Sequence, residues 1–230
     1  MIPEDNVVEK DEKYFDVLKG LCYAVDKFGI DLVITDLEKI QKEIESCEMK
    51  KKAEDYFAHG FYTDDHGKTF HLSETINIPG GNEATAAEIS NNGLLFNARN
   101  QKGDIKARIV AKSNDGGQTW SSIYFDKNLP DPVCEGSILN IGMKKGKHLL
   151  AFCNAADTAK RDNLTLRISF DEGLTWKKKI LIDKSEEVKR NDFTAYSDIV
   201  MMNKKETGVL YERDGYAQIV FTVIKWKKRK

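Results

Sequence analysis

The four cysteines and four histidines of this chain are the residues best suited to bind a metal or to carry redox chemistry. Neither set has the spacing that such sites need, because no two cysteines form a CxxC pair and the histidines do not recur at ligand spacing. The residues are Cys22, Cys47, Cys134, Cys153, His59, His66, His71 and His148. We therefore expect ordinary thiols, no catalytic metal and no cofactor.

An octapeptide recurs three times, with Ser or Thr first, Asp third, Gly fifth, Thr seventh and an aromatic residue last. The copies span residues 63–70, 113–120 and 169–176, so they begin about 50 residues apart, close to the period of four-stranded propeller blades. The Asp can close a turn by accepting from backbone N–H groups, and the Gly can adopt a positive φ. The final Phe70, Trp120 or Trp176 is expected to fill apolar space beside the next strand. The boxes predict hairpin turns of a propeller, and by themselves they do not indicate an enzyme.

The elements that would hold these turns differ between two parts of the chain. Residues 1–57 contain only two of the 16 glycines, and apolar residues recur there at three- and four-residue steps, which predicts a hairpin of two helices. From residue 58 onward, short β-type runs alternate with Gly, Asn and Asp turns. The runs cover 93–99, 106–113, 148–155, 164–170, 197–202, 207–213 and 217–226. We expect a helical hairpin over 1–57 and a mainly β domain over 58–230.

The composition excludes several classes of partner. With 36 basic and 37 acidic residues, the net charge is -1, so there is no electrostatic basis for wholesale nucleic-acid binding. No apolar run reaches the roughly 20 residues of a membrane span. The first ten residues, MIPEDNVVEK, lack the basic and apolar regions of an export signal, and the sequence leaves the compartment open.

The segments in and between the boxes resemble the bacterial exo-α-sialidase (neuraminidase) family. The matching segments are YTDDHGKTFHL, GGNEATAAEI, LLFNARNQ, SNDGGQTW, VCEGSIL, RDNLTLRISFDEGLTW, AYSDIVMM and VLYERDGY, in the family's order. They run from about residue 58 to the end of the chain and are similar to the C-terminal half of the family. The resemblance implies part of a six-bladed β-propeller. It also implies hydrolysis of terminal α-linked sialic acid from glycoconjugates, with retention of configuration.

The resemblance assigns roles to individual residues. Tyr196 of AYSD matches the family's nucleophile, and Glu83 of GGNEAT matches the carboxylate that activates it. A phenol suits a substrate whose anomeric carbon bears a carboxylate, because an anionic nucleophile would be repelled. Arg99 and Arg161 match two of the three arginines that bind this carboxylate. Glu212 of VLYER matches a residue that holds the first arginine in place.

Other features depart from the family pattern. Glu135 of VCEGS stands where the family often carries glutamine near the sugar, and a carboxylate there would repel an anionic ligand. No arginine precedes Arg99, although the family's first arginine lies upstream in a motif of the Phe-Arg-Ile-Pro type. The acid/base aspartate is missing as well, and such a group contributes typically ~10²- to 10⁴-fold to the rate. At the observed spacing, residues 58–230 suffice for about three and a half blades.

Three functions stay open on this basis. The chain is a sialidase unit completed by a separately encoded N-terminal half, or a non-catalytic module that binds sialic acid through Arg99 and Arg161, or a degenerate propeller fragment. A homodimer, in which two open halves complete one ring, is a variant of each.

Overall fold

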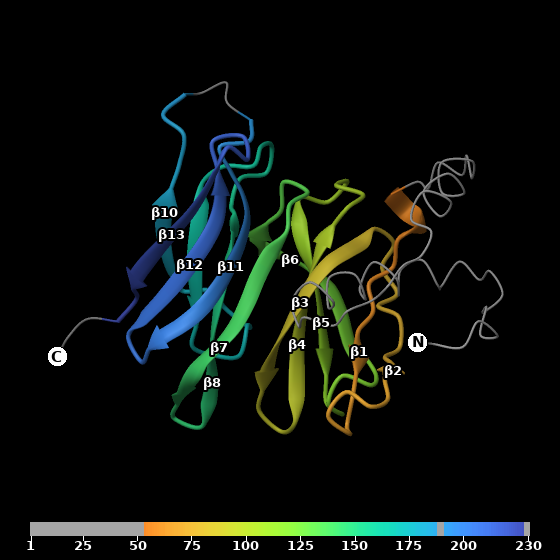
Figure 1. Ribbon diagram of the computed structural model, residues 1–230. Helices are drawn as coiled ribbons and strands as arrows, with labels where there is room; N and C mark the ends of the chain where they lie inside the picture. The colour runs from red at the N-terminus through yellow and green to blue at the C-terminus, as the bar shows by residue number, and fades with distance from the viewer. Residues whose placement is uncertain (1–52, 188–190, 228–230) are drawn as a thin grey trace, which may run out of the picture. The chain divides into compact units, whose positions relative to one another are not determined.

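The computed structural model describes residues 53–187 and 191–227 (Figure 1). These residues form antiparallel β-sheets and one 3-10 turn, η1 (Ala53–Asp55). The prediction of a mainly β domain beyond residue 58 is therefore confirmed. The predicted helical hairpin lies outside the described residues except for 53–57, which hold η1 and no α-helix.

Three larger sheets follow one another along the chain, after a small sheet of β1 (Phe61–Tyr62) and β2 (His71–Leu72) (Figure 1). The first sheet contains β3 (Gly81–Ile89), β4 (Gly93–Asn100), β5 (Ala107–Ser113) and β6 (Ser122–Pro130). The second contains β7 (Gly136–Lys144), β8 (Lys147–Ala155), β9 (Leu164–Ser169) and β10 (Lys178–Asp183). The third contains β11 (Thr194–Asn203), β12 (Glu206–Arg213) and β13 (Gln218–Lys225). Each of the seven predicted runs coincides with one of these strands.

Two tight hairpins show how the local sequence sets the strand pairing. Asn91 and Asn92 join β3 to β4 with φ of 61° and 56°, and Lys145 and Gly146 join β7 to β8 with φ of 51° and 75°. Positive φ at both central residues is typical of the type I′ turn, whose twist matches that of the flanking strands. These turns place Ile89 opposite Gly93 and, at the other end of the same pair, Gly81 opposite Asn100.

The three boxes form turns with a shared hydrogen-bond pattern. Asp115 shows it: one carboxylate oxygen accepts from the backbone N–H of Thr119 at 3.0 Å, and the other accepts from the Thr119 hydroxyl at 2.6 Å. Asp65 and Asp171 bond Thr69 and Thr175 in the same way. The box glycines have the predicted positive φ: Gly67 (84°), Gly117 (95°) and Gly173 (81°). The boxes at 113–120 and 169–176 begin at the last residues of β5 and β9, at what we call the box end of the sheets.

The aromatic residues of the boxes differ in burial. Trp176 is buried and donates its indole N–H to Asp126 at 3.1 Å, and Trp120 packs partly buried on the first sheet. Phe70 is 61% exposed and meets Phe61 edge-on at 5.8 Å. The expectation that all three aromatics fill apolar space is wrong for Phe70, because the two-residue strands β1 and β2 offer too little surface to cover a ring.

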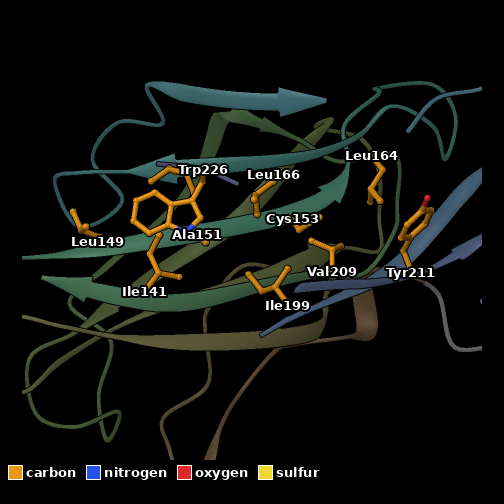
Figure 2. Close-up of a cluster of buried hydrophobic side chains, with 11 residues drawn as sticks. Ile141, Leu149, Ala151, Cys153, Leu164, Leu166, Ile199, Val209, Tyr211 and Trp226 are labelled. Carbon is orange, nitrogen blue, oxygen red and sulfur yellow. The ribbon is translucent and has the colours of Figure 1, made fainter. Parts of the chain in front are cut away.

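The core lies between successive sheets. Leu95 and Val110 of the first sheet pack with Leu150 and Phe152 of the second. A larger cluster joins the second sheet to the third and includes Trp226 (Figure 2). Its members are Ile141, Leu149, Ala151, Cys153, Leu164, Leu166, Ile168, Ile199, Val209, Tyr211 and Trp226. This packing fixes the relation between strand ends of different sheets, and that relation builds the candidate site.

Candidate active site

Glu83 lies at the end of the first sheet opposite the boxes, in a β-bulge. The register between β3 and β4 shifts between Asn82, which is opposite Arg99, and Ala84, which is opposite Ala98. A bulge adds an unpaired residue and turns its side chain away from the regular alternation. The bulge therefore explains how Glu83 leaves the regular strand pattern close to Arg99, the last but one residue of β4.

Tyr196 lies in a second bulge, at the start of β11. The register between β11 and β12 shifts between Thr194 and Ser197. Two carboxylates hold the bulged backbone: Glu212 accepts from the N–H of Tyr196 at 3.2 Å, and Glu135 accepts from the N–H of Ser197 at 3.0 Å. The two acids that the sequence placed near the site thus contact the backbone around Tyr196.

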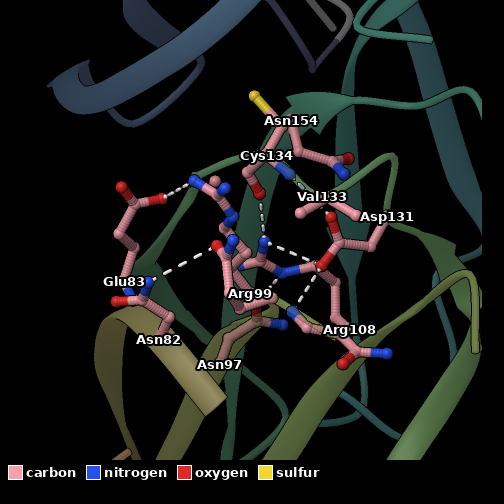
Figure 3. A network of polar contacts seen from close by, with 12 residues as sticks. Asn82, Glu83, Asn97, Arg99, Arg108, Asp131, Val133, Cys134 and Asn154 are labelled. Atoms are coloured by element: carbon pink, nitrogen blue, oxygen red, sulfur yellow. Dashed lines mark hydrogen bonds and ion pairs between the residues drawn. The ribbon is translucent and has the colours of Figure 1, made fainter. Parts of the chain in front are cut away.

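Glu83, Arg99 and Tyr196 meet across the first and third sheets. The Tyr196 hydroxyl donates to one carboxylate oxygen of Glu83 in a short hydrogen bond. The Nη1 group of Arg99 donates to the other Glu83 oxygen at 2.6 Å and to the Tyr196 hydroxyl at 3.0 Å. The Arg99 side chain is 9% exposed and that of Glu83 31%. Figure 3 shows the contact between Arg99 and Glu83. The three side chains form a closed, charge-assisted triangle.

Arg161 approaches the ring of Tyr196 from the loop between β8 and β9. Its guanidinium carbon lies 5.8 Å from the centre of the Tyr196 ring, within the range of a cation–π contact. Its Nη1 donates to the Tyr216 hydroxyl at 2.9 Å, and its Nη2 donates to the carbonyl of Val133 at 3.0 Å. The backbone of Arg161 also accepts from Thr194 N–H at 3.1 Å, which ties this loop to the start of β11.

Burial and charge shift two pKa values in the site. Burial, followed by the hydrogen bond to Glu83, raises the pKa of Tyr196 to about 12. Burial likewise raises the pKa of Glu135 to about 7, against the lowering effect of the Ser197 N–H bond. The Tyr196 phenol is therefore protonated at neutral pH, and Glu135 changes charge close to neutrality.

A buried network that the sequence analysis missed lies beside Arg99 (Figure 3). Arg108 is fully buried. Its Nε donates to the Asn97 side-chain oxygen at 2.7 Å, and its Nη1 donates to the Cys134 carbonyl at 2.5 Å. The same Nη1 lies 3.3 Å from a carboxylate oxygen of Asp131. Asp131 also accepts from the N–H groups of Cys134 and Asn100, at 2.9 and 2.8 Å. These bonds hold residues 131–135, the loop that carries Glu135. The only sequence signal was a single arginine inside the apolar run ARIVA.

Val133, in the same loop, has φ of 64°. A β-branched residue rarely adopts positive φ, and such conformations persist where the surroundings enforce them. The Asp131 and Arg108 bonds on either side of Val133 supply that constraint. Its carbonyl is thereby directed at Arg161, so the strained residue belongs to the support of the site.

The structure brings together all six residues that the sequence analysis singled out. Glu83, Arg99 and Tyr196 bond one another, Arg161 lies over the Tyr196 ring, and Glu212 and Glu135 bond the adjacent backbone. Tyr216, the last residue of the matching segment VLYERDGY, joins them although it was given no role, and Arg108 and Asp131 join them from outside the quoted segments. The distances place the group in one site, while the chemical role of each member is a separate question.

Among the described residues, no cluster of three or more His, Cys, Asp or Glu side chains could hold a metal ion. Cys134 and Cys153 are free and buried, and burial raises the pKa of both thiols to about 12, so they remain protonated. Cys22 and Cys47 lie outside the described residues. Within 53–187 and 191–227, no helix has the length and apolar character needed to cross a membrane.

Comparison with known proteins gives the family. Residues 39–211 match the family described as a BNR repeat-like domain. The chain belongs to this family. The matched residues make up three quarters of the chain and include all three boxes.

Relatives of this BNR repeat-like chain include sialidases. The sialidase of Bacteroides fragilis is 33% identical over 172 residues, which are 72% of this chain and 30% of the relative. That of Micromonospora viridifaciens is 32% identical over 157 residues, or 66% and 23%. The solved structure of the Hadza microbial sialidase Hz136 aligns with a TM-score of 0.63 at 30% identity, covering 75% of this chain and 33% of that one. The predicted resemblance to sialidases is confirmed, and the chain spans about a third or less of these proteins.

Proposed function

We propose that this chain carries part of the active site of a retaining exo-α-sialidase, with residues 58–230 forming about half of a six-bladed propeller. Tyr196 is the nucleophile, Glu83 its base, and Arg99 and Arg161 bind the substrate carboxylate. The observation that carries the proposal is the direct hydrogen bond from the Tyr196 hydroxyl to Glu83, with Arg99 bonded to both. The substrate class is a terminal α-linked sialic acid, as the names of the relatives suggest.

The Tyr196 and Glu83 pair supplies the nucleophile on demand. Because the pKa of Tyr196 is about 12, the phenol keeps its proton until attack, and a neutral oxygen can approach the anionic sugar. As the phenol oxygen bonds to the anomeric carbon, its proton passes to Glu83 and the bond to the leaving oxygen breaks. Water then displaces Tyr196 from the sugar. Two inversions at the same carbon give net retention.

The two arginines provide the positive charge that an anionic sugar needs. Arg99 bonds the Tyr196 hydroxyl and Arg161 lies over the Tyr196 ring, and both guanidinium groups are held in place by hydrogen bonds to neighbouring groups. A guanidinium binds a carboxylate through two parallel N–H bonds and stays charged at every physiological pH. Substrate would take over some of the N–H groups that now bond Tyr196, Tyr216 and Val133.

Two expected parts have no counterpart in this sequence, the first arginine and the acid/base aspartate. Without a general acid, loss of an alkoxide leaving group slows by typically ~10²- to 10⁴-fold. A leaving group that is stable as an anion does not need that proton. We therefore expect residues 1–230 alone to favour aryl sialosides strongly over natural glycosides, and to need the two missing groups from elsewhere for full activity on the latter.

The test is hydrolysis of 4-methylumbelliferyl α-sialoside and of sialyllactose by the purified chain. We expect slow turnover of the aryl sialoside that disappears in Tyr196→Phe and persists in Tyr62→Phe, a matched change away from the site. Glu83→Gln should reduce the rate by ~10²-fold or more, since the base is lost. Turnover that survives Tyr196→Phe would refute the assignment of the nucleophile.

A second candidate is binding of sialic acid without turnover. The feature that favours it is that Arg99 already bonds both Glu83 and Tyr196, so the triangle is stable without substrate. In this case calorimetry would detect sialic acid binding that is lost in Arg161→Ala, while neither sialoside is hydrolysed. Absence of both turnover and binding would leave the fragment without either activity.

A further inference from the structure

Tyr216 lies in the turn that joins β12 to β13, and the backbone of this turn is strained. Asp214, Gly215 and Tyr216 have φ of 61°, 61° and 68°. Glycine adopts positive φ freely, but L-residues do so mostly one at a time, and a bulky tyrosine there is an outlier. Such conformations persist where the surroundings enforce them, and they are concentrated at functional sites. The strained turn thus marks Tyr216 as a candidate functional residue.

Backbone hydrogen bonds to the segment before β11 enforce this conformation. The N–H of Asp214 donates to the carbonyl of Phe193 at 2.8 Å, and the N–H of Gly215 donates to the carbonyl of Asp192 at 2.8 Å. Within the turn, the N–H of Ala217 donates to the carbonyl of Asp214 at 3.3 Å. The turn is therefore fixed on the two residues that directly precede β11.

The same segment also fixes the backbone of Arg161. Arg161 and Asp192 form an isolated parallel β-bridge, and the N–H of Thr194 donates to the carbonyl of Arg161 at 3.1 Å. Tyr196 follows two residues after Thr194. Arg161, Tyr196 and Tyr216 come from three separate stretches of the chain, yet this one segment joins their backbones. The fold itself therefore sets how these three residues lie relative to one another.

The side chain of Tyr216 reaches the guanidinium group of Arg161. The Nη1 group of Arg161 donates to the Tyr216 hydroxyl oxygen at 2.9 Å. The guanidinium carbon of Arg161 lies 5.8 Å from the centre of the Tyr196 ring. The Tyr216 hydroxyl thus lies at the guanidinium group to which we assign the substrate carboxylate.

The hydroxyl of Tyr216 still has a proton to donate. A phenol can accept two hydrogen bonds and donate one. The bond from Arg161 occupies an acceptor position, and no group in residues 53–187 and 191–227 accepts from the Tyr216 hydroxyl. Hydrogen bonds in a chain polarise one another, so accepting from a guanidinium group makes the hydroxyl a stronger donor. A strong donor is therefore available beside a permanent positive charge.

A carboxylate fits this pair of donors better than a sugar hydroxyl does. Each carboxylate oxygen accepts more than one hydrogen bond, so one carboxylate can bind a guanidinium group and a neighbouring hydroxyl together. The bonds from Arg161 to Tyr216 and to the Val133 carbonyl use two of its N–H groups, and the guanidinium group has others for a ligand. A charged acceptor also benefits from the positive charge of Arg161, whereas a neutral sugar hydroxyl gains much less.

We propose that Tyr216 is a further substrate-binding residue, whose hydroxyl donates to the sialic acid carboxylate beside Arg161. The proposal rests on the proposed function, because that function supplies the carboxylate. Tyr216 then adds a hydrogen bond without adding charge. Since the family's first arginine has no counterpart in this sequence, the Tyr216 hydroxyl contributes a larger share of the bonds to the carboxylate here.

The first experiment measures the binding of methyl α-sialoside to residues 1–230 by NMR titration. Methoxide is a poor leaving group, so this ligand binds without turnover. Tyr216→Phe removes only the hydroxyl and should raise the dissociation constant roughly 10-fold or more, as expected for a hydrogen bond to a charged acceptor. The matched change Tyr62→Phe should leave the dissociation constant unchanged.

Kinetics with the aryl sialoside give a second measurement of the same bond. Tyr216→Phe should raise KM by a factor similar to the change in the dissociation constant and leave kcat unchanged. The reason is that the carboxylate does not react, so its bonds are equally strong before and during the reaction.

Replacement of Tyr216 by 3-fluorotyrosine separates donation to the carboxylate from simple support of Arg161. Fluorine makes the hydroxyl a better hydrogen-bond donor and a poorer acceptor. At mildly acidic pH, where the fluorinated phenol is protonated, a hydroxyl that donates to the carboxylate should give a lower dissociation constant than the unsubstituted chain. A hydroxyl that only accepts from Arg161 should give a higher one.

Two results would overturn this proposal and leave the proposed function standing. One is a dissociation constant that does not change in Tyr216→Phe. The other is a 3-fluorotyrosine variant that binds no more tightly than the unsubstituted chain, which would make Tyr216 a support for Arg161 only. If the unsubstituted chain bound no sialoside, the proposed function would fail and this proposal would fail with it.

Discussion

The two ends of the sheets differ in how far apart along the chain their hydrogen-bonded residues lie. At the box end, each turn bonds within a span of four residues, as Asp115 does to Thr119, and the same pattern recurs three times on an exposed surface. At the site end, the bonds join Tyr196 to Arg99, 97 residues away, and to Glu83, 113 residues away. The residues there do not repeat, and they are partly buried, with Arg99 almost fully so. The first end depends on local sequence, and the second on the packing of three sheets.

The pKa values follow the same division. Hydrogen bonds from the backbone and hydroxyl of Thr69 lower the pKa of Asp65 to about 2. At the site end, burial raises the pKa of Tyr196 to about 12 and that of Glu135 to about 7. Charges in the boxes are stabilised by the turns that hold them, whereas charges at the site are costly and depend on specific partners. The comparison predicts that perturbations at the two ends differ in size and in pH dependence.

The largest effect is expected from Asp131→Ala beneath the site. It leaves the fully buried Arg108 guanidinium without its counter-charge and removes the acceptor for two backbone N–H groups. Breaking such a buried pair costs roughly 3–5 kcal/mol in the free energy of unfolding. Urea denaturation measures the loss.

The matched control for Asp131→Ala is Asp104→Ala. This change breaks the exposed ion pair between Asp104 and Lys102, whose charged atoms are 3.0 Å apart. A surface pair contributes about 0–1 kcal/mol. If Asp131→Ala cost no more than Asp104→Ala, the buried network would not be a support of the site end, and the comparison between the two ends would fail.

Gly173→Ala in the third box should have the next largest effect, because this box touches another sheet. The φ of Gly173 is 81°, and an added Cβ would lie 2.5 Å from Leu95 of the first sheet. Strain and overpacking together should lower the free energy of unfolding by about 2–4 kcal/mol. Gly146→Ala has a similar φ of 75° with open space around it, so about 1 kcal/mol is expected. Equal costs in thermal denaturation would show that the contact with Leu95 is unimportant.

Glu135→Gln should stabilise the protein, and only at higher pH. The pKa of Glu135 is raised from 4.5 to about 7, so between these values the folded chain holds a proton that the unfolded chain has lost. The free energy of unfolding therefore falls as the pH rises through this window. Glutamine keeps an acceptor for Ser197 N–H without the buried charge. We expect a gain of roughly 1–3 kcal/mol at pH 8 and none at pH 4. A gain that is the same at both pH values would contradict burial as the cause.

Asp171→Ala should have the smallest effect and the opposite pH dependence. It removes the acceptor of the Thr175 N–H and hydroxyl at 2.8 and 2.6 Å, at a cost of about 1 kcal/mol at pH 7. Burial opposes the shift, but these bonds lower the pKa of Asp171. The contribution of the Asp171 carboxylate to the free energy of unfolding is therefore complete above the unfolded pKa of 3.8 and is lost as the pH falls below that value. Thermal denaturation at pH 7 and pH 3 measures both. A cost that persists unchanged at pH 3 would exclude the charged carboxylate as its source.

Prediction from the sequence was accurate where the controlling interactions are local. The runs in β4, β5, β8 and β9 either alternate between apolar and polar residues or are continuously apolar. Each box contains both the donors and the acceptors of the hydrogen bonds that close its turn. The same reasoning failed for Phe70, because burial of an aromatic ring depends on what packs over it. It also passed over Arg108 and Asp131, since a buried ion pair between residues 23 apart leaves no periodic signal.

The amino-acid sequence by itself determined the β-strands, the three turns and the family, because each depends on residues close together along the chain or on motifs that can be recognised one at a time. Only the tertiary structure decided that bulges direct Glu83 and Tyr196 toward each other, that Arg108 and Asp131 support the loop beside them, and that one face of the third sheet is not covered by any other described residue. Bulges, buried ion pairs and open faces depend on the register between strands and the packing between sheets. These are set by the sum of many weak contacts over the whole domain, and no short segment encodes them.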